Sequence, residues 1–140
     1  MPVRTANARW DGALSDGNGT MRFADYAGPF TFASRFEEGE GTNPEELIGG
    51  AVAGCYSMAL SGDLGAAGHS PAAVETEAEV EVRPDPAGGF SITRIHLKTT
   101  ATVPGIADDE FQQIAVGTKS GCPVSKALAS VPITLEAKLT

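Results

Sequence analysis

The chain has 140 residues, of which 41% are hydrophobic, and this length and composition predict a single folded domain over residues 1–140. The formal net charge of −8 and the scattered lysines and arginines exclude nucleic acid as a partner, because an acidic surface repels phosphate. No apolar stretch approaches the length of a membrane span, and no secretory signal is visible in the N-terminal residues. We therefore expect a cytoplasmic protein that does not bind membranes.

The first third of the chain consists of short segments of alternating apolar and polar residues, separated by glycine-containing turns. This pattern predicts strands over about residues 3–11, 19–24 and 29–34, paired as hairpins.

A long helix is predicted next. Residues 42–46 combine cap residues, a proline for the first helical position and two acidic residues, and the helix then runs to about residue 66 and stops at Gly68. Its interior is apolar or small nearly all round, which predicts burial on most faces. Gly49, Gly50 and Gly54 each cost about 1 kcal/mol relative to alanine, which indicates that something packs very close to this helix.

The pattern changes to alternation after residue 71. Residues 74–82 alternate apolar or small side chains with glutamates, which predicts a half-buried antiparallel strand with an acidic outer face. A turn at residues 84–89 leads to a second strand from residue 90 to 103. We expect Arg94 and Lys98 to face the glutamates, and His96 to be an ordinary surface histidine on the same side.

The last part of the chain predicts a second helix, a short third helix and a final strand. Asp108 is expected to cap the second helix, which extends to about Lys119. Residues 121–123 interrupt it, residues 123–129 form a short helix, and residues 133–139 close the chain as a strand. The order of strands, helix, hairpin, helices and strand predicts an α+β domain.

The two cysteines, Cys55 and Cys122, allow two interpretations. A structural disulfide is improbable in a reducing compartment, and His69 and His96 are not at zinc-ligand spacing from either cysteine. The cysteines are then either inert buried thiols or a redox pair. Cys122 precedes Pro123, a residue that favours the start of a helical turn, and the dipole there favours a thiolate.

Arg35 and Glu45 are, on local grounds, a surface charge and an ordinary first-turn helix residue. If both lay beside Cys55, arginine would lower the thiol pKa and could hold the oxygens of a substrate, while glutamate would fix the guanidinium. Glu45 and Cys55 are ten positions apart in one predicted helix, roughly 15 Å along its axis. A shared site therefore needs a bend or a second subunit, and the glycines favour an intertwined dimer.

Several motifs, in this order along the chain, resemble the OsmC/Ohr family. They are residues 42–49 (TNPEELIG), 55–60 (CYSMAL), 101–106 (ATVPGI) and 121–125 (GCPVS). The similarity extends from Trp10 to the final strand, and Arg35 together with the Pro-Glu-Glu-Leu run is closer to the osmotically inducible protein C branch. Members of that branch often have alanine or histidine where this chain has residues 50–54. This chain can therefore differ from them in substrate preference and in reaction rate.

The resemblance implies an intertwined α+β homodimer with active sites at the subunit interface and thiol peroxidase activity toward organic hydroperoxides. It implies that Cys55 is the peroxidatic cysteine, Cys122 the resolving cysteine, and Arg35 and Glu45 the activating pair. It also implies a dithiol reductant, plausibly a lipoylated protein, a role against oxidative and osmotic stress, and no metal or cofactor. Two alternatives stay open: a non-catalytic dimer that binds an apolar ligand in its interface cleft, and a structural dimer whose cysteines only pack.

Overall fold

The computed structural model describes residues 1–140. In chain order its elements are β1 (Asn7–Asp11), β2 (Asn18–Phe23), β3 (Tyr26–Phe30), α1 (Phe32–Phe36), α2 (Pro44–Ala66), β4 (Ala73–Pro84), β5 (Phe90–Thr102), α3 (Asp108–Gly121), α4 (Pro123–Ala127) and β6 (Ile133–Leu139). This is the α+β class that the sequence predicts. The chain divides into an N-terminal unit, residues 1–47, and a C-terminal unit, residues 48–140.

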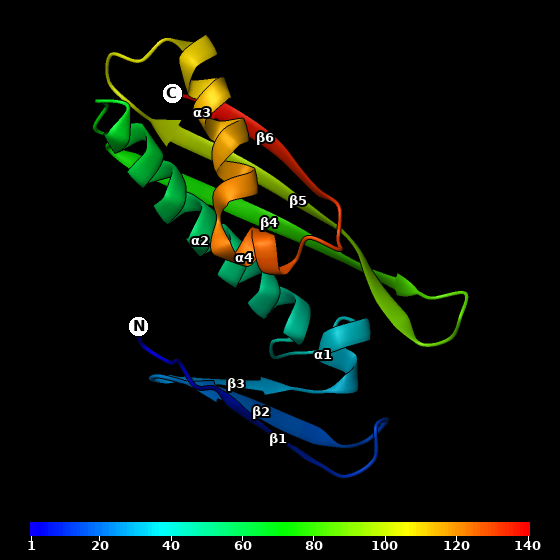
Figure 1. Ribbon diagram of the computed structural model, residues 1–140. Coiled ribbons are helices and arrows are strands. Elements are labelled where there is room, and N and C mark those ends of the chain that lie inside the picture. The colour runs from blue at the N-terminus through cyan, green and yellow to red at the C-terminus, as the bar shows by residue number, and fades with distance from the viewer. The chain divides into compact units, whose positions relative to one another are not determined.

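The N-terminal unit is a three-stranded antiparallel sheet in the order β1-β2-β3, followed by the short helix α1 (Figure 1). The expected strand over residues 29–34 is wrong beyond Phe30. Thr31 ends it, because its hydroxyl accepts the Ser34 N–H at 3.1 Å while the Ser34 hydroxyl accepts the Thr31 N–H at 2.8 Å. This reciprocal capping starts a helix in place of a longer strand.

No apolar side chain of the N-terminal unit is buried. Its buried residues are Gly19, Gly28, Ser34 and Glu45. The aromatic rings of Phe23 and Tyr26 stack on each other but remain exposed. A three-stranded sheet gains stability by covering an apolar face, so this unit has no hydrophobic core of its own.

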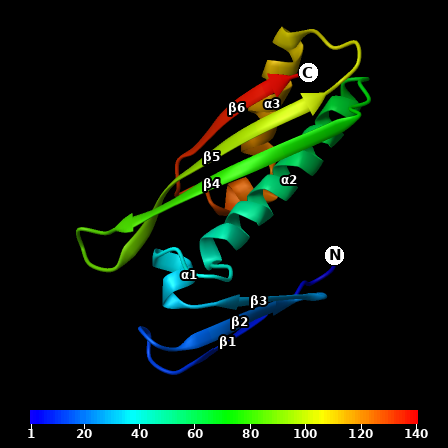
Figure 2. The same cartoon turned by 180° about the vertical axis from the view of Figure 1, so that it is seen from behind.

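The C-terminal unit is a sheet in the order β4-β5-β6 with helices on one face only (Figures 1 and 2). β4 and β5 pair antiparallel as predicted, and β6 lies parallel to β5. The core lies between sheet and helices. Its fully buried apolar side chains come from α2, β5 and α3: Val52, Tyr56, Leu60, Leu64, Ile95, Leu97, Ala101, Phe111 and Ala115.

Helix α2 begins and ends where the sequence predicts, and Asn43 caps it by accepting the Glu46 N–H at 2.8 Å. Its burial differs from the prediction. Only one stripe, with Val52 and Tyr56 among its members, is buried, and Met58 on another face is 82% exposed. The three-stranded sheet covers one side of the helix, so burial on most faces is wrong for the single chain.

The glycines of α2 are not equivalent. A Cβ on Gly49 would lie 3.4 Å from the carbonyl oxygen of Ala78 on β4, which is an ordinary van der Waals contact and not the very close approach that the sequence predicts. A Cβ on Gly50 or Gly54 would meet no atom within 4 Å. The close contact expected at these two positions is therefore not made by the chain itself.

Helix α2, with 23 residues, is also long and apolar enough to cross a membrane by length and composition. The expectation that no stretch approaches a membrane span is therefore wrong. One such helix is weak evidence for a span, because the core helix of a soluble protein has the same length and composition.

The C-terminal elements match the predictions with two differences at helix ends. Lys98 pairs with Glu77 and Glu79, as expected for the outer face of the hairpin. Ala107, not Asp108, is the N-cap of α3, and it makes no side-chain cap. Helix α4 ends at Ala127, two residues earlier than predicted.

Replacement of Leu60 by alanine should lower the free energy of unfolding by about 3 kcal/mol, because it leaves a cavity under α2. Chemical denaturation followed by circular dichroism measures the change. Val116 is 58% exposed on α3, so Val116→Ala is the control and should change stability by less than about 0.5 kcal/mol. Equal effects of the two substitutions would contradict the assigned core.

Candidate active site

Cys55 and Cys122 are free thiols of the C-terminal unit, and they lie close enough for each to shift the pKa of the other. Cys55 is partly buried on α2, whereas Cys122 is fully buried between α3 and α4. The backbone of Cys122 is held on both sides. Its N–H donates to the Thr118 carbonyl at 3.1 Å, and its carbonyl accepts the Lys126 N–H at 3.0 Å.

Two hydrogen bonds hold α2 against α3 near the cysteines. The Tyr56 hydroxyl donates to the Ala115 carbonyl at 3.0 Å, and the Thr118 hydroxyl donates to the Asp63 carboxylate at 2.6 Å. The sequence analysis did not identify these residues. The presence of Tyr56 in an apolar helix could have indicated such a bond, because a buried tyrosine hydroxyl normally requires a hydrogen-bond partner.

The contact between the two thiols separates their pKa values. Burial raises the pKa of Cys55, and the neighbouring Cys122 raises it further. Burial opposes ionisation of Cys122 as well, but donation from the Cys55 thiol, from Ser125 and from the Val124 N–H outweighs it and lowers the Cys122 pKa. Within one chain, the interaction between the thiols thus opposes ionisation of Cys55 and favours ionisation of Cys122.

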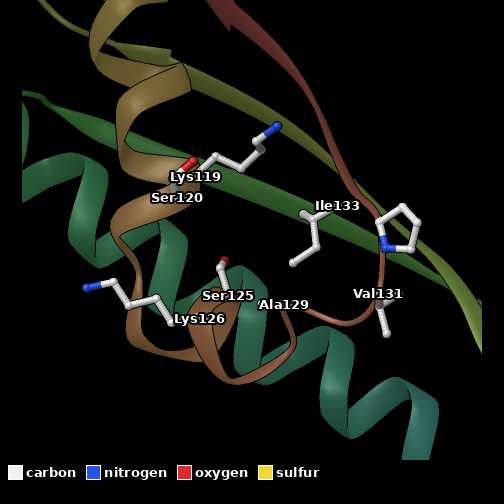
Figure 3. A pocket seen from close by; sticks show the side chains of 8 residues that line it. Lys119, Ser120, Ser125, Lys126, Ala129, Val131 and Ile133 are labelled. Carbon is white, nitrogen blue, oxygen red and sulfur yellow. The ribbon is translucent and has the colours of Figure 1, made fainter.

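Ser125 on α4 is a further member of this site. It is 6% exposed, and its Oγ has no hydrogen-bond partner of regular geometry, although it lies close enough to Cys122 to lower the thiol pKa. Ser125 also borders a hollow of about 350 Å³ between α3, α4 and the start of β6 (Figure 3). The other residues that line the hollow are Lys119, Ser120, Lys126, Ala129, Val131, Pro132 and Ile133.

Arg35 and Glu45 form a bidentate ion pair in the N-terminal unit. Arg35 Nη2 donates to Glu45 Oε1 at 2.7 Å, and Nε lies 3.2 Å from both carboxylate oxygens. Glu45 is 7% exposed, and the guanidinium also lies 5.1 Å from the centre of the Phe36 ring. Such a paired and stacked guanidinium has a fixed orientation, and its remaining N–H groups can bind an anion or a peroxide oxygen.

The four predicted site residues thus occur as two pairs, each within one unit. The thiol pair belongs to the C-terminal unit, and the Arg35–Glu45 pair belongs to the N-terminal unit. The assembly of all four into one active site stays a prediction.

The histidines belong to neither pair. His69 contacts Glu110 at 3.0 Å, and His96 contacts the Thr134 hydroxyl at 2.6 Å on the outer face of the sheet. No group of three or more histidine, cysteine, aspartate or glutamate side chains is arranged to hold a metal ion.

Comparison with known proteins gives one consistent result. Residues 37–136 match the family model described as OsmC-like protein. Peroxiredoxin OsmC of Escherichia coli (strain K12) is 44% identical over 139 residues, covering 97% of this chain and 96% of that protein. Among solved structures, the OsmC-like protein of Mycoplasma pneumoniae superposes with a TM-score of 0.79 at 15% identity, covering 99% and 98% of the two chains. The organic hydroperoxide resistance protein OhrB of Bacillus subtilis does so with a TM-score of 0.67 at 22% identity, covering 97% and 98%.

Substitution of Cys55 by alanine should raise the pKa of Cys122, because it removes a hydrogen-bond donor to the Cys122 thiolate. The reciprocal change, Cys122→Ala, should lower the pKa of Cys55, because it removes a neighbouring thiol that raises it. Thiolate absorbance measured across a pH titration reports both values. Unchanged pKa values in the two variants would show that the thiols are not in contact.

Proposed function

We propose, from the premise that this chain belongs to the OsmC family, that it reduces organic hydroperoxides to alcohols through a Cys55–Cys122 disulfide. The homologues named peroxiredoxin OsmC support a peroxidase role. The observation that carries the finer proposal is the contact between two free thiols, one partly buried and one fully buried.

The first step takes place at Cys55, the more exposed of the two sulfurs. Its thiolate attacks the outer peroxide oxygen, the O–O bond breaks, and the departing alkoxide takes a proton to become an alcohol. Cys55 is left as a sulfenic acid. The Cys122 thiolate then attacks the Cys55 sulfur, the S–O bond breaks, the departing hydroxide takes a proton from solvent to become water, and the disulfide forms. The lowered pKa of Cys122 supports its role as this second nucleophile.

Cys55 needs a cation to ionise, because burial and Cys122 raise its pKa within one chain. We assign that cation to Arg35, held by Glu45. Glu45 and Cys55 are ten residues apart in α2, a spacing of roughly 15 Å along a helix, which supports donation of the pair by a second chain. The proposed unit is therefore an intertwined homodimer of single OsmC-like domains spanning residues 1–140.

Two further features support the homodimer. Gly50 and Gly54 present an open face of α2, where a second helix can approach closely. The N-terminal unit has no buried apolar side chain, so its sheet has an apolar face available for a partner. Burial of such faces is the usual source of dimer stability.

The proposed substrates are alkyl or lipid hydroperoxides. An apolar hollow of about 350 Å³ adjoins the paired guanidinium of Arg35. Its other lining residues are Trp10, Gly12, Leu14, Phe30, Thr31, Phe32 and Phe36. An apolar substituent buried against these rings adds binding energy that hydrogen peroxide lacks. A dithiol, possibly on a lipoylated protein, then reduces the disulfide in the cytoplasm as a defence against oxidative or osmotic stress.

Treatment of the reduced protein with one equivalent of cumene hydroperoxide should yield a Cys55–Cys122 disulfide, detected by peptide mass spectrometry. Cys55→Ser should abolish turnover, whereas Cys122→Ser should accumulate Cys55 sulfenic acid, which dimedone traps. Hydrogen peroxide should react more slowly than cumene hydroperoxide. Both cysteines still free after peroxide treatment would contradict the mechanism.

Arg35→Ala should lower peroxidase activity at least about tenfold, because the Cys55 thiolate loses its cation. Arg9→Ala is the matched control. Arg9 also forms a bidentate pair, with Asp11 on β1, but it is exposed and should leave activity unchanged.

Mixing the weakly active chain Arg35→Ala with the inactive chain Cys55→Ser tests whether Arg35 acts across the dimer. Co-refolded in equal amounts, they should recover about a quarter of wild-type activity, because half of the dimers are mixed and each holds one intact site. If Arg35 acts within its own chain, the mixture has no intact site and keeps only the residual activity of Arg35→Ala.

A further inference from the structure

The two sulfurs of the proposed disulfide differ in their access to solvent. Cys122 has no exposed surface, whereas Cys55 is partly buried. A thiol reagent must reach a sulfur along the line of the S–S bond, so it meets Cys55 first. The difference in exposure therefore favours attack of a reductant on Cys55, with Cys122 as the leaving group; we call this the direction of opening of the disulfide.

Ser125 gives the buried sulfur a donor that the exposed sulfur lacks. The Ser125 side chain is more than nine-tenths buried, and its Oγ has no hydrogen-bond partner of regular geometry while both thiols are reduced. A buried hydroxyl without a partner costs stability, so its position beside Cys122 calls for an explanation. The Val124 N–H acts on both thiols, whereas the Ser125 hydroxyl is among the groups that lower the pKa of Cys122.

We propose that the external reductant attacks Cys55 Sγ, and that the Ser125 hydroxyl stabilises Cys122 as the departing thiolate. The inference rests on the proposed disulfide and specifies how that disulfide is opened. It makes Ser125 a residue of the reductive half of the cycle, distinct from the Arg35–Glu45 pair, which serves the oxidative half.

The step balances as a thiol–disulfide exchange. The attacking thiolate forms a new S–S bond with Cys55 while the Cys55–Cys122 bond breaks, and its electron pair moves to Cys122 Sγ. Ser125 donates a hydrogen bond to that sulfur without transferring its proton. The second thiol of the reductant then attacks the reductant sulfur that is bonded to Cys55. The Cys55 thiolate departs, and the reductant becomes a disulfide.

Ser125 favours this direction because a thiol with a lower pKa is the better leaving group. Departure of Cys122 places the negative charge where the Ser125 hydroxyl and the Val124 N–H can donate to it.

A trapping experiment tests which sulfur is attacked. The disulfide is prepared with diamide, so that its formation does not require peroxidase activity, and is then treated with the monothiol N-acetylcysteine. Acid quench and pepsin digestion at low pH fix the mixed disulfide for mass spectrometry. We expect the adduct on Cys55 and a free thiol on Cys122.

The outcomes separate this inference from the proposed function. An adduct on Cys122 would overturn the direction of opening and leave the peroxidase mechanism standing. If neither diamide nor cumene hydroperoxide forms the disulfide, both proposals are wrong.

Ser125→Ala tests the role of the hydroxyl. The rate of opening by N-acetylcysteine should fall about tenfold, and the pKa of Cys122 should rise, while the rate of peroxide consumption in a single turnover changes less. Ser125→Thr, which keeps a hydroxyl, should restore most of the rate. Ser120→Ala, in the same hollow but exposed, is the control and should behave as wild type. An unchanged opening rate and Cys122 pKa in Ser125→Ala would overturn the assignment.

Discussion

Pro123 has no N–H to donate to a preceding helical turn, and this constraint ends α3 at Gly121 and starts α4 in a new direction. Cys122 lies at the junction, with its N–H bonded to the end of α3 and its carbonyl bonded into α4. The sulfur is thereby fixed toward α2, where Cys55 lies. The thiol contact, the separation of the two pKa values and the position of Ser125 all depend on this junction.

The fold follows from the sequence where local rules decide. Alternation with glutamates defines β4, and the residues around Asn43 define the start of α2, because both depend on neighbours within a few positions. The strand predicted at residues 29–34 was too long, because the alternating pattern of this segment also suits a strand. The capping pair of Thr31 and Ser34, which starts a helix instead, involves only two residues and was overlooked. The one-sided burial of α2 could not be predicted, since small residues suit a crowded face and an open one equally.

The candidate site divides in the same way. The family resemblance identified Cys55, Cys122, Arg35 and Glu45, and the structure shows the thiol contact and the ion pair. Ser125 and Tyr56 were not identifiable from the sequence, because their importance comes from Cys122 and Ala115, one of them 59 positions away. A serine in a short helix has no distinguishing local pattern. Its burial beside a cysteine is visible only once the junction is folded.

The contact between Cys55 and Cys122 in the reduced state bears on how long the protein survives its own substrate. A sulfenic acid that has not yet met its partner thiol can be oxidised by a second peroxide to a sulfinic acid, which thiols do not reduce. In the proposed cycle, the second thiol already lies near the first before oxidation, which favours rapid formation of the disulfide. The geometry thus suits a scavenger that resists overoxidation, and distinguishes it from a sensor that records high peroxide by inactivating itself.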